Sequence, residues 1–361
     1  MQFHFRTFRK ILAALSITAD YLSAFLAYFL LMTVTGNILL GTDPFFDFLS
    51  FLRFFAIAVV SSVAVGFANL YAVVPLARKS GFFVSVFSGV LIYVASALAG
   101  IMFVAIMERA VMNVFNAGYR DFYAESIFFI RFEFLPLTLF LFIVSFPIRI
   151  IHVIAERIGQ KNIIDVVFDR YRVPHEEDRV FMFMDLHAST AAAEKLGHLR
   201  YHQMLDEVFH DISDVIAQYH GEVYQYVGDA VVVTWDINTG TEKMNCVRCF
   251  FDIQAVMNGM AEKYWNAYAF KPWFKAGIHS GKVIAGEVGD LKKEIAYHGV
   301  AVNIASRIQA SCLDYNAPLL VSEELFLSFP ISGLQQIKSE FIGCINVKGR
   351  ENRICLYRID P

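Results

Sequence analysis

The chain has 361 residues, of which 57% are hydrophobic and 36 are phenylalanine, and its formal net charge is -3. This hydrophobic fraction is too high for a single soluble globular protein. The small net charge gives no electrostatic reason to expect a nucleic-acid partner.

The first part of the chain is predicted to be a membrane domain, residues 1–148. Four apolar runs, at about 11–33, 51–76, 82–107 and 126–148, are each long enough to cross a bilayer as a helix. Because no small-residue cleavage site accompanies the first run, we interpret it as an anchor and not as a removed signal peptide. We therefore expect the lipid bilayer to be a partner of this domain.

The distribution of Lys and Arg predicts the orientation of these spans. Basic residues precede the first span (Arg6, Arg9 and Lys10) and separate the second from the third (Arg78 and Lys79), whereas the loop at 34–50 has none. Basic segments tend to stay in the cytoplasm. We therefore expect a multi-pass protein of the cell (inner) membrane, with both termini and the C-terminal half in the cytoplasm.

Asp20 is an ionisable residue well inside the first span. An ionisable group within a membrane suggests a function by default, so structural pairing and a sensing role both remain open for it. Three other charged residues lie near span ends, where their side chains can reach the interface: Arg53, Arg131 and Glu133.

Residues 149–177 form a predicted juxtamembrane helix and linker. The segment "IIHVIAERIGQKNIIDVVFDRY" has apolar residues at helical spacing. It can lie on the membrane surface or form a parallel two-chain coil that passes a signal onward. We favour the coil.

Residues 178–361 have the pattern of a separate soluble domain. "RVFMFMDL" predicts a strand, "GEVYQYVGDAVVVTW" a hairpin around Gly228 and Asp229, and "FKAGIHSGKVIAGEVG" a further hairpin. Long helical segments follow the first strand and the first hairpin, and Gly197 interrupts the first of them. This βαββαβ order predicts an α+β ferredoxin-like fold.

All five cysteines lie in this half of the chain: Cys246, Cys249, Cys312, Cys344 and Cys355. Cys246 and Cys249 have a spacing found in zinc sites, but they fall in a helical segment and no second pair matches them. We therefore expect packed, reduced thiols, which fits a cytoplasmic domain.

Two carboxylates are predicted to meet at one edge of the sheet. Asp185 ends the apolar strand "FMFMDL", and Asp229 occupies the turn of the neighbouring hairpin. Carboxylates this close repel each other unless they share a proton or a divalent cation. The turn "LHAST" after the strand opens a helix whose N–H groups favour phosphate. Together these features predict a site for a magnesium–triphosphate complex.

The segment "VNIASR" places Asn303 and Arg307 four residues apart on one face of a helix. Apolar and small residues surround them, so this face is not ordinary solvated surface. An Arg directed at a phosphorus centre stabilises the charge that develops there.

In this order, "FMDLHAST", "GEVYQYVGD", "GIHSGKVIAGEVG", "VNIASR" and "INVKGR" resemble the catalytic domain of class III nucleotidyl (adenylate/guanylate) cyclases of the bacterial, membrane-anchored type. The resemblance covers about residues 178–358. It implies a homodimer with active sites across the interface, and two Mg²⁺ (or Mn²⁺) ions. It also implies two-metal chemistry, in which the ribose 3′-hydroxyl attacks the α-phosphate and pyrophosphate leaves.

The resemblance assigns roles to the residues already singled out. Asp185 and Asp229 match the metal-binding aspartates, and the carbonyl of Leu186 is expected to be an extra metal ligand. Asn303 matches the residue that orients the ribose, and Arg307 the residue that stabilises the transition state. Both would come from the partner chain.

Further positions match substrate-binding residues of the family. Lys275 and Arg350 fall where basic residues hold the phosphates, and Thr190 falls near the triphosphate. Gln225 and Ala296 occupy the positions at which adenylate cyclases commonly read the base with a Lys and an Asp or Thr. Gln225 can pair with adenine or with another base, whereas Ala296 has no hydrogen-bonding group.

The resemblance implies an enzyme, a membrane-bound adenylate cyclase that is a phosphorus–oxygen lyase converting ATP to 3′,5′-cyclic AMP and pyrophosphate. One alternative is a cyclase for GTP or a pyrimidine triphosphate. The other is a catalytically silent, cyclase-like nucleotide sensor, which the retention of Asp185, Asp229, Asn303 and Arg307 disfavours. A transporter with a nucleotide-binding domain is disfavoured because only four spans are expected. The signal that the membrane domain reads is not identified.

Overall fold

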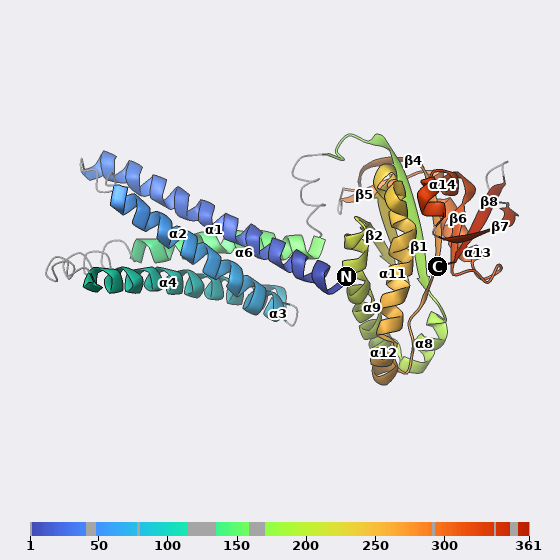
Figure 1. Ribbon diagram of the computed structural model, residues 1–361, viewed down its shortest axis with the longest axis horizontal. Coiled ribbons are helices and arrows are strands. Elements are labelled where there is room, and N and C mark those ends of the chain that lie inside the picture. Colours follow the sequence, from blue (N-terminus) through green and yellow to red (C-terminus); the bar gives the residue numbers. More distant parts are fainter. Residues whose placement is uncertain are drawn as a thin grey trace. The chain divides into compact units, whose positions relative to one another are not determined.

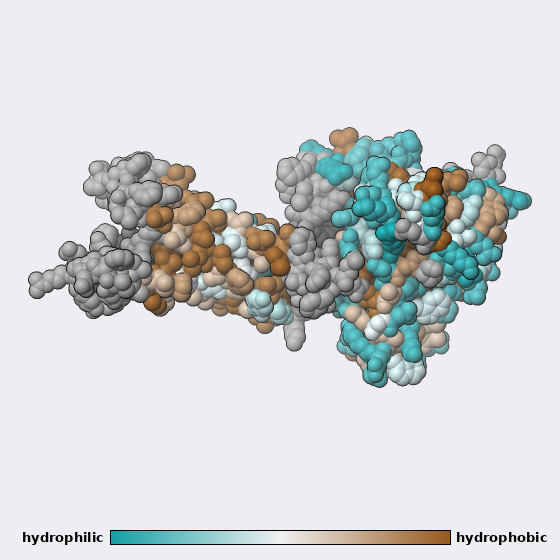
Figure 2. All heavy atoms as spheres, viewed as in Figure 1, coloured by the Kyte–Doolittle hydropathy of each residue, from teal (hydrophilic) through white to brown (hydrophobic). Residues whose placement is uncertain are grey.

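The computed structural model describes residues 2–40, 48–77, 80–114, 135–158, 170–290, 293–335, 337–346 and 353–360. The chain divides into two compact units, one formed by Arg6–Ile164 and the other containing Asp165–Pro361 (Figure 1). Hydrophobic residues dominate the visible surface of the helical unit, whereas hydrophilic residues are frequent on the other unit (Figure 2).

The described part of the first unit is helical. Its elements are α1 (Gln2–Leu40), α2 (Phe48–Ala68), the π-helical segment η1 (Asn69–Val73), α3 (Val74–Ala77), α4 (Phe82–Val114) and α6 (Leu135–Ile158). Within the described residues, four segments are long and apolar enough to cross a membrane: Ile11–Leu31, Phe54–Ala77, Phe82–Met107 and Pro136–Ile154. They suggest membrane-spanning helices.

The fourth apolar segment lies further along the chain than the predicted 126–148. The early part of that prediction falls outside the described residues, and the helix continues past Arg149 to Ile158. Arg149 is fully buried and donates from Nη2 to the Ser85 Oγ at 2.9 Å. Helix α6 therefore continues through Arg149, whose side chain is held inside the unit, and the first part of the predicted juxtamembrane helix belongs to α6.

Polar side chains join the helices of this unit. The Asp20 carboxylate on α1 lies 2.8 Å from Nε2 of His152 on α6, and the hydroxyls of Tyr21 and Ser145 connect the same two helices. Tyr93 on α4 donates to the Asn69 side chain in η1 at 2.7 Å. Asp20 therefore has the pairing that we considered, and its sensing role stays a hypothesis.

The second unit is built on one mixed sheet. Its eight described strands are β1 (His175–Leu186), β2 (Glu222–Val227), β3 (Ala230–Asp236), β4 (Phe274–Val288), β5 (Glu294–His298), β6 (Leu319–Ser322), β7 (Lys338–Ile345) and β8 (Ile354–Asp360). They lie in the order β2-β3-β1-β4-β6-β8-β7, with β5 pairing β4. The first four strands follow the ferredoxin-like order, which confirms the predicted fold class.

Nine described helical segments accompany these strands. They are α8 (Ser189–Leu196), α9 (His198–Gln218), α10 (Ile237–Thr241), η3 (Glu242–Met244), α11 (Asn245–Gly259), α12 (Ala261–Tyr268), α13 (Val300–Ser311), α14 (Glu323–Leu327) and α15 (Ile331–Leu334). The predicted interruption at Gly197 separates α8 from α9. Figure 1 shows α9 and α11 side by side over the sheet.

The hairpin predicted for "FKAGIHSGKVIAGEVG" is wrong, because this segment is the single long strand β4. Gly277 in this strand lies where a helix approaches the sheet closely. A Cβ atom at Gly277 would lie 2.2 Å from the backbone nitrogen of Gln309 on α13. Gly277 therefore lets a helix pack directly on the strand.

Successive side chains of β1 point to opposite faces of the sheet and so pack into two different clusters. Val180, Met182, Met184 and Leu186 belong to the core formed with α9 and α11. Phe181 belongs to a smaller cluster that includes two residues of α13, Ala301 and Ala305, and Phe183 packs against it. Since Asp185 follows Phe183 by two residues, it lies on the α13 side of the sheet.

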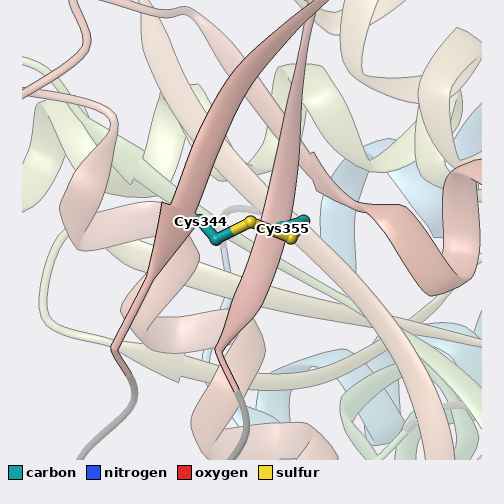
Figure 3. Close-up of a disulfide and its surroundings, with 2 residues drawn as sticks. All are labelled: Cys344 and Cys355. Atoms are coloured by element: carbon teal, nitrogen blue, oxygen red, sulfur yellow. A yellow bond between two sulfur atoms is a disulfide. The ribbon is translucent and has the colours of Figure 1, made fainter.

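The cysteines are of two kinds. Cys246 and Cys249 on α11 are buried free thiols, as predicted, and burial raises the pKa of Cys246 to about 12. Cys344 and Cys355 form a disulfide between β7 and β8 (Figure 3), so the expectation of reduced thiols is wrong for this pair. The pairing of β7 with β8 places the two residues directly opposite each other, although they are 11 residues apart in the chain.

Candidate active site

Asp185 and Asp229 are brought together by the pairing of three strands. Asp185 lies opposite Ala230 of β3, and Asp229 immediately precedes Ala230 in the turn that closes the β2–β3 hairpin. Gly228 in this turn has a φ of +63°, which glycine adopts readily. Burial raises the pKa of the half-buried Asp185, and the negative charge of Asp229 raises it further. The two carboxylates therefore interact electrostatically in the folded chain.

Lys275 lies beside this pair. It is the first residue after Phe274 on β4 and is directly opposite Asp185 in the antiparallel β1–β4 pairing. Its side chain is buried, and its Nζ is 5.4 Å from the centre of the Trp273 ring. The predicted phosphate-binding lysine is thus positioned at the carboxylates, where its charge acts to lower the pKa of Asp185.

The start of α8 forms another side of the site. The Leu186 side chain is buried in the core, so only its backbone carbonyl can serve a ligand. Ala188 precedes the helix in the left-handed conformation, with a φ of 56°, and caps it with no side-chain hydrogen bond. Thr190 is exposed in the first turn. The N–H groups of this turn are therefore available to an anion such as a phosphate.

Asn303 and Arg307 share a face of α13, as predicted. The residues of α13 that face its own sheet are Ala301, Ile304, Ala305 and Ile308, which are all buried. Asn303 is exposed and Arg307 is half-buried. This face is therefore turned away from the sheet that carries Asp185 and Asp229.

Gln225 and Ala296 lie on β2 and β5, which approach each other. The ring centroids of their neighbours, Tyr224 and Tyr297, are 5.1 Å apart. Gln225 is exposed and Ala296 is half-buried. The two predicted base-reading positions thus fall in one region of the unit. Arg350, the remaining predicted phosphate ligand, lies outside the described residues.

Two side chains at the site were not predicted from the sequence. The Gln309 side chain on α13 lies close enough to Asp185 to act on it, and it opposes the rise in the pKa of that carboxyl. Burial raises the pKa of Tyr201 on α9, and the charges of Asp229 and Asp185 raise it further. The only sequence signal for Gln309 is its position near the core-facing residues of a helix that also carries Asn303.

The donor atoms at this site suit a hard divalent cation. Across the described ranges, no group of three or more His, Cys, Asp or Glu side chains could hold a metal ion. Asp185, Asp229 and the Leu186 carbonyl nevertheless offer oxygen atoms. Mg²⁺ is commonly bound by one or two carboxylates, with water and substrate phosphate completing its shell. The residues therefore fit Mg²⁺ or the similar Mn²⁺.

Comparison with known proteins identifies related chains. Adenylate cyclase 2 of Rhizobium meliloti (strain 1021) is 33% identical over 214 residues, 59% of this chain and 58% of that protein. Adenylate cyclase 1 of the same organism is 25% identical over 52% of this chain and 28% of its own length. The chain thus spans less than two thirds of either relative.

Among solved structures, the adenylyl cyclase CyaB from P. aeruginosa is 20% identical, with a TM-score of 0.45, over 52% of this chain and 96% of that one. The model of the family "Adenylate and Guanylate cyclase catalytic domain" matches residues 173–360, more than half of the chain. The protein therefore belongs to the family of class III adenylate and guanylate cyclases.

Proposed function

We propose that this protein is a membrane-bound adenylate cyclase that converts ATP to 3′,5′-cyclic AMP and pyrophosphate as a homodimer. The observation that carries the proposal is the approach of Asp185 and Asp229 on the fold of this family, with Lys275 beside them. The 33% identity to a protein named adenylate cyclase supports the choice of reaction.

Asp185, Asp229 and the Leu186 carbonyl are the residues that would hold two Mg²⁺ (or Mn²⁺) ions. Bound ions would activate the ribose 3′-hydroxyl as a nucleophile and neutralise charge on the triphosphate. The ammonium group of Lys275 and the N–H groups at the start of α8, next to Thr190, bind the phosphate oxygens. Arg350 is proposed to add a further phosphate contact.

Asn303 and Arg307 act on the substrate of the partner chain. They point away from their own sheet, so a second copy of the chain has to supply them to each pair of carboxylates. Asn303 orients the ribose for in-line attack. Arg307 stabilises the charge that develops on the α-phosphate.

Gln225 is proposed to select the base. Its amide both donates and accepts, so it matches the N6–H donor and the N1 acceptor of adenine. The Ala296 methyl group makes no hydrogen bond and leaves the selection to Gln225.

The proposed arrangement in the cell follows from the chain order and the basic residues. Residues 1–148 would anchor the protein in the inner membrane, and 178–361 would form the catalytic domain in the cytoplasm. Residues 149–177 would connect these two domains. The four apolar helices support the anchor. The Arg and Lys residues before the first span support the orientation.

A product assay tests the proposal. Full-length protein in detergent is incubated separately with ATP, GTP, CTP and UTP and with Mg²⁺ or Mn²⁺, and the products are identified by mass. Asp185→Ala removes a proposed metal ligand, and Asp314→Ala removes an exposed carboxylate as the matched control.

Cyclic AMP from the wild type and from Asp314→Ala, but not from Asp185→Ala, is the expected result. A cyclic product from another triphosphate would overturn the choice of ATP. No product from folded, dimeric protein would indicate a silent nucleotide sensor.

A further inference from the structure

We propose that Gln309 is a positioning residue of the metal site, whose amide holds the Asp185 carboxylate in the orientation that binds a divalent cation. The inference rests on the proposed function only in taking Asp185 as a metal ligand. It concerns how this chain prepares that ligand.

Asp185 lies on the side of the sheet on which α13 packs. Phe181 and Phe183 on the same side of β1 belong to, or pack against, the cluster that contains Ala301 and Ala305 of α13. Asp185 is next in this alternation. Helix α13 is therefore the helix that packs on the side of the sheet to which Asp185 points.

Helix α13 approaches the sheet very closely near Asp185. Gly277 is paired with Phe183 on β1. A side chain at position 277 would therefore point to the same side of the sheet as Phe183 and Asp185. A Cβ atom there would lie 2.2 Å from the Gln309 nitrogen and 2.7 Å from its Cα. The backbone of α13 thus touches the sheet at Gln309, two register positions from Asp185. From there the Gln309 side chain acts on the Asp185 carboxyl and opposes the rise in its pKa.

Gln309 and Arg307 lie on different faces of α13. At about 100° per residue, Gln309 lies roughly 200° from Arg307 and next to the core-facing Ile308 and Ala305. It therefore points to its own sheet, whereas Arg307 and Asn303 point away. One helix serves the carboxylates of its own chain with one face and the proposed partner site with the other.

An uncharged amide suits a position beside a metal-binding carboxylate. An amide donor binds one carboxylate oxygen and leaves the lone pairs of the other oxygen for a cation. It carries no charge, so it does not repel the cation as a second lysine would. Outer donors that orient metal-binding carboxylates change metal affinity by about 10- to 100-fold when they are removed.

The test measures metal binding directly, without catalysis. Full-length Gln309→Met is titrated with Mn²⁺ alone, and free Mn²⁺ is measured by electron paramagnetic resonance. Methionine keeps the length of the side chain and removes the amide. Gln335→Met makes the same change at an exposed position after α15 and is the matched control.

We expect the dissociation constant for Mn²⁺ to rise about tenfold or more in Gln309→Met and to stay unchanged in Gln335→Met. In turnover, the KM for Mn²⁺ should rise by more than kcat falls, which a general loss of structure would not produce. If Gln309→Met lacks native tryptophan fluorescence, Gln309→Asn is used, because it retains an amide that is one CH₂ too short to reach.

The outcomes separate this inference from the proposed function. Unchanged Mn²⁺ affinity and KM in the folded Gln309 variants, with an active wild type, overturn the positioning role alone. A wild type that makes no cyclic nucleotide, yet binds Mn²⁺ more tightly than its Gln309 variants, overturns the proposed reaction and supports the positioning role.

Discussion

Lys275 lies directly opposite Asp185 in the pairing of β4 with β1. The strand register thus places the positively charged Lys275 side chain beside the Asp185 carboxylate, which also interacts with Asp229. Burial and the Asp229 charge nevertheless raise the pKa of Asp185, against the opposing effects of Gln309 and Lys275. The negative charge of Asp185 is therefore destabilising in the metal-free protein, as is common where a site is prepared for a ligand.

Asp185→Asn should stabilise the metal-free protein at neutral pH while abolishing turnover. A carboxyl group whose pKa is higher in the folded state favours folding below its unfolded pKa of about 3.9. This contribution is lost as the pH rises through the folded value. In EDTA, the variant should melt at a higher temperature than the wild type at pH 7, and the difference should shrink towards pH 3.

The measurement is thermal unfolding followed by tryptophan fluorescence, because Trp235, Trp265 and Trp273 all lie in the catalytic unit. Mn²⁺ should raise the melting temperature of the wild type more than that of Asp185→Asn. A variant that melts below the wild type at pH 7 would contradict the prediction.

Arg179→Ala should destabilise the catalytic unit by about 3–5 kcal/mol, the usual effect of removing one partner from a buried ion pair. Arg179 is 3% exposed and donates to Glu177 at 2.9 Å and to Glu222 at 3.0 Å. Its removal leaves both carboxylates without this partner. Urea unfolding followed by tryptophan fluorescence measures the effect.

Lys282→Ala is the control for Arg179→Ala. Lys282 and Glu176 form an ion pair whose side chains are 65% and 55% exposed. Exposed pairs contribute little to stability, so no clear shift is expected. An equal loss of unfolding free energy in the two variants would show that burial does not decide how much these ion pairs contribute to stability.

Gly277→Ala should displace α13 and reduce both stability and turnover. The added methyl group would lie 2.2 Å from a backbone atom of Gln309, which cannot rotate away as a side chain can. Gly259→Ala, at the end of α11, meets nothing within 4 Å and should leave both properties nearly unchanged. Wild-type turnover in Gly277→Ala would contradict the tight approach of α13.

The Cys344–Cys355 disulfide predicts a specific labelling pattern. In denaturant without reductant, an alkylating reagent should label Cys246, Cys249 and Cys312, and all five cysteines after reduction. Replacing Cys344 and Cys355 by serine should cost about 3 kcal/mol or less, given the short loop. The cost should vanish when both proteins are compared in a reducing buffer. Five labelled cysteines in the purified, unreduced protein would contradict the pairing.

The proposed dimer predicts complementation between two inactive variants. Co-expressed Asp185→Asn and Arg307→Ala chains would form mixed dimers with one intact active site. If the chains pair at random, activity should return to about a quarter of the wild-type value. Separately purified variants that are assayed alone provide the control. No recovery in verified mixed dimers would contradict sites shared between chains.

The sequence predicted the ferredoxin-like order because strand alternation and helical periodicity are local signals. The alternation in β1 even predicts which residues share a side with Asp185. Local signals failed for β4, where a segment that was predicted to be a hairpin forms one long strand. They also failed at Cys344 and Cys355, because the hairpin that unites them depends on register.

The site was predictable only in part, for a related reason. Asp185 and Asp229 follow from the strand order, and Asn303 and Arg307 from their spacing on a helix. Gln309 reaches Asp185 only through the contact between α13 and β4, which is a tertiary feature. The burial of Arg149 among its neighbours likewise could not be predicted from an apolar run.

Helix α6 is fastened to its neighbours by directional bonds. His152 pairs with Asp20, Ser145 with Tyr21, and Arg149 with Ser85. Apolar surfaces slide over one another in lipid with little preference, whereas hydrogen bonds fix the rotation of a helix about its axis. Helix α6 therefore resists turning or shifting independently of α1 and α4. The three helices α1, α4 and α6 therefore move together, and a change in the position of one of them would shift the other two as well.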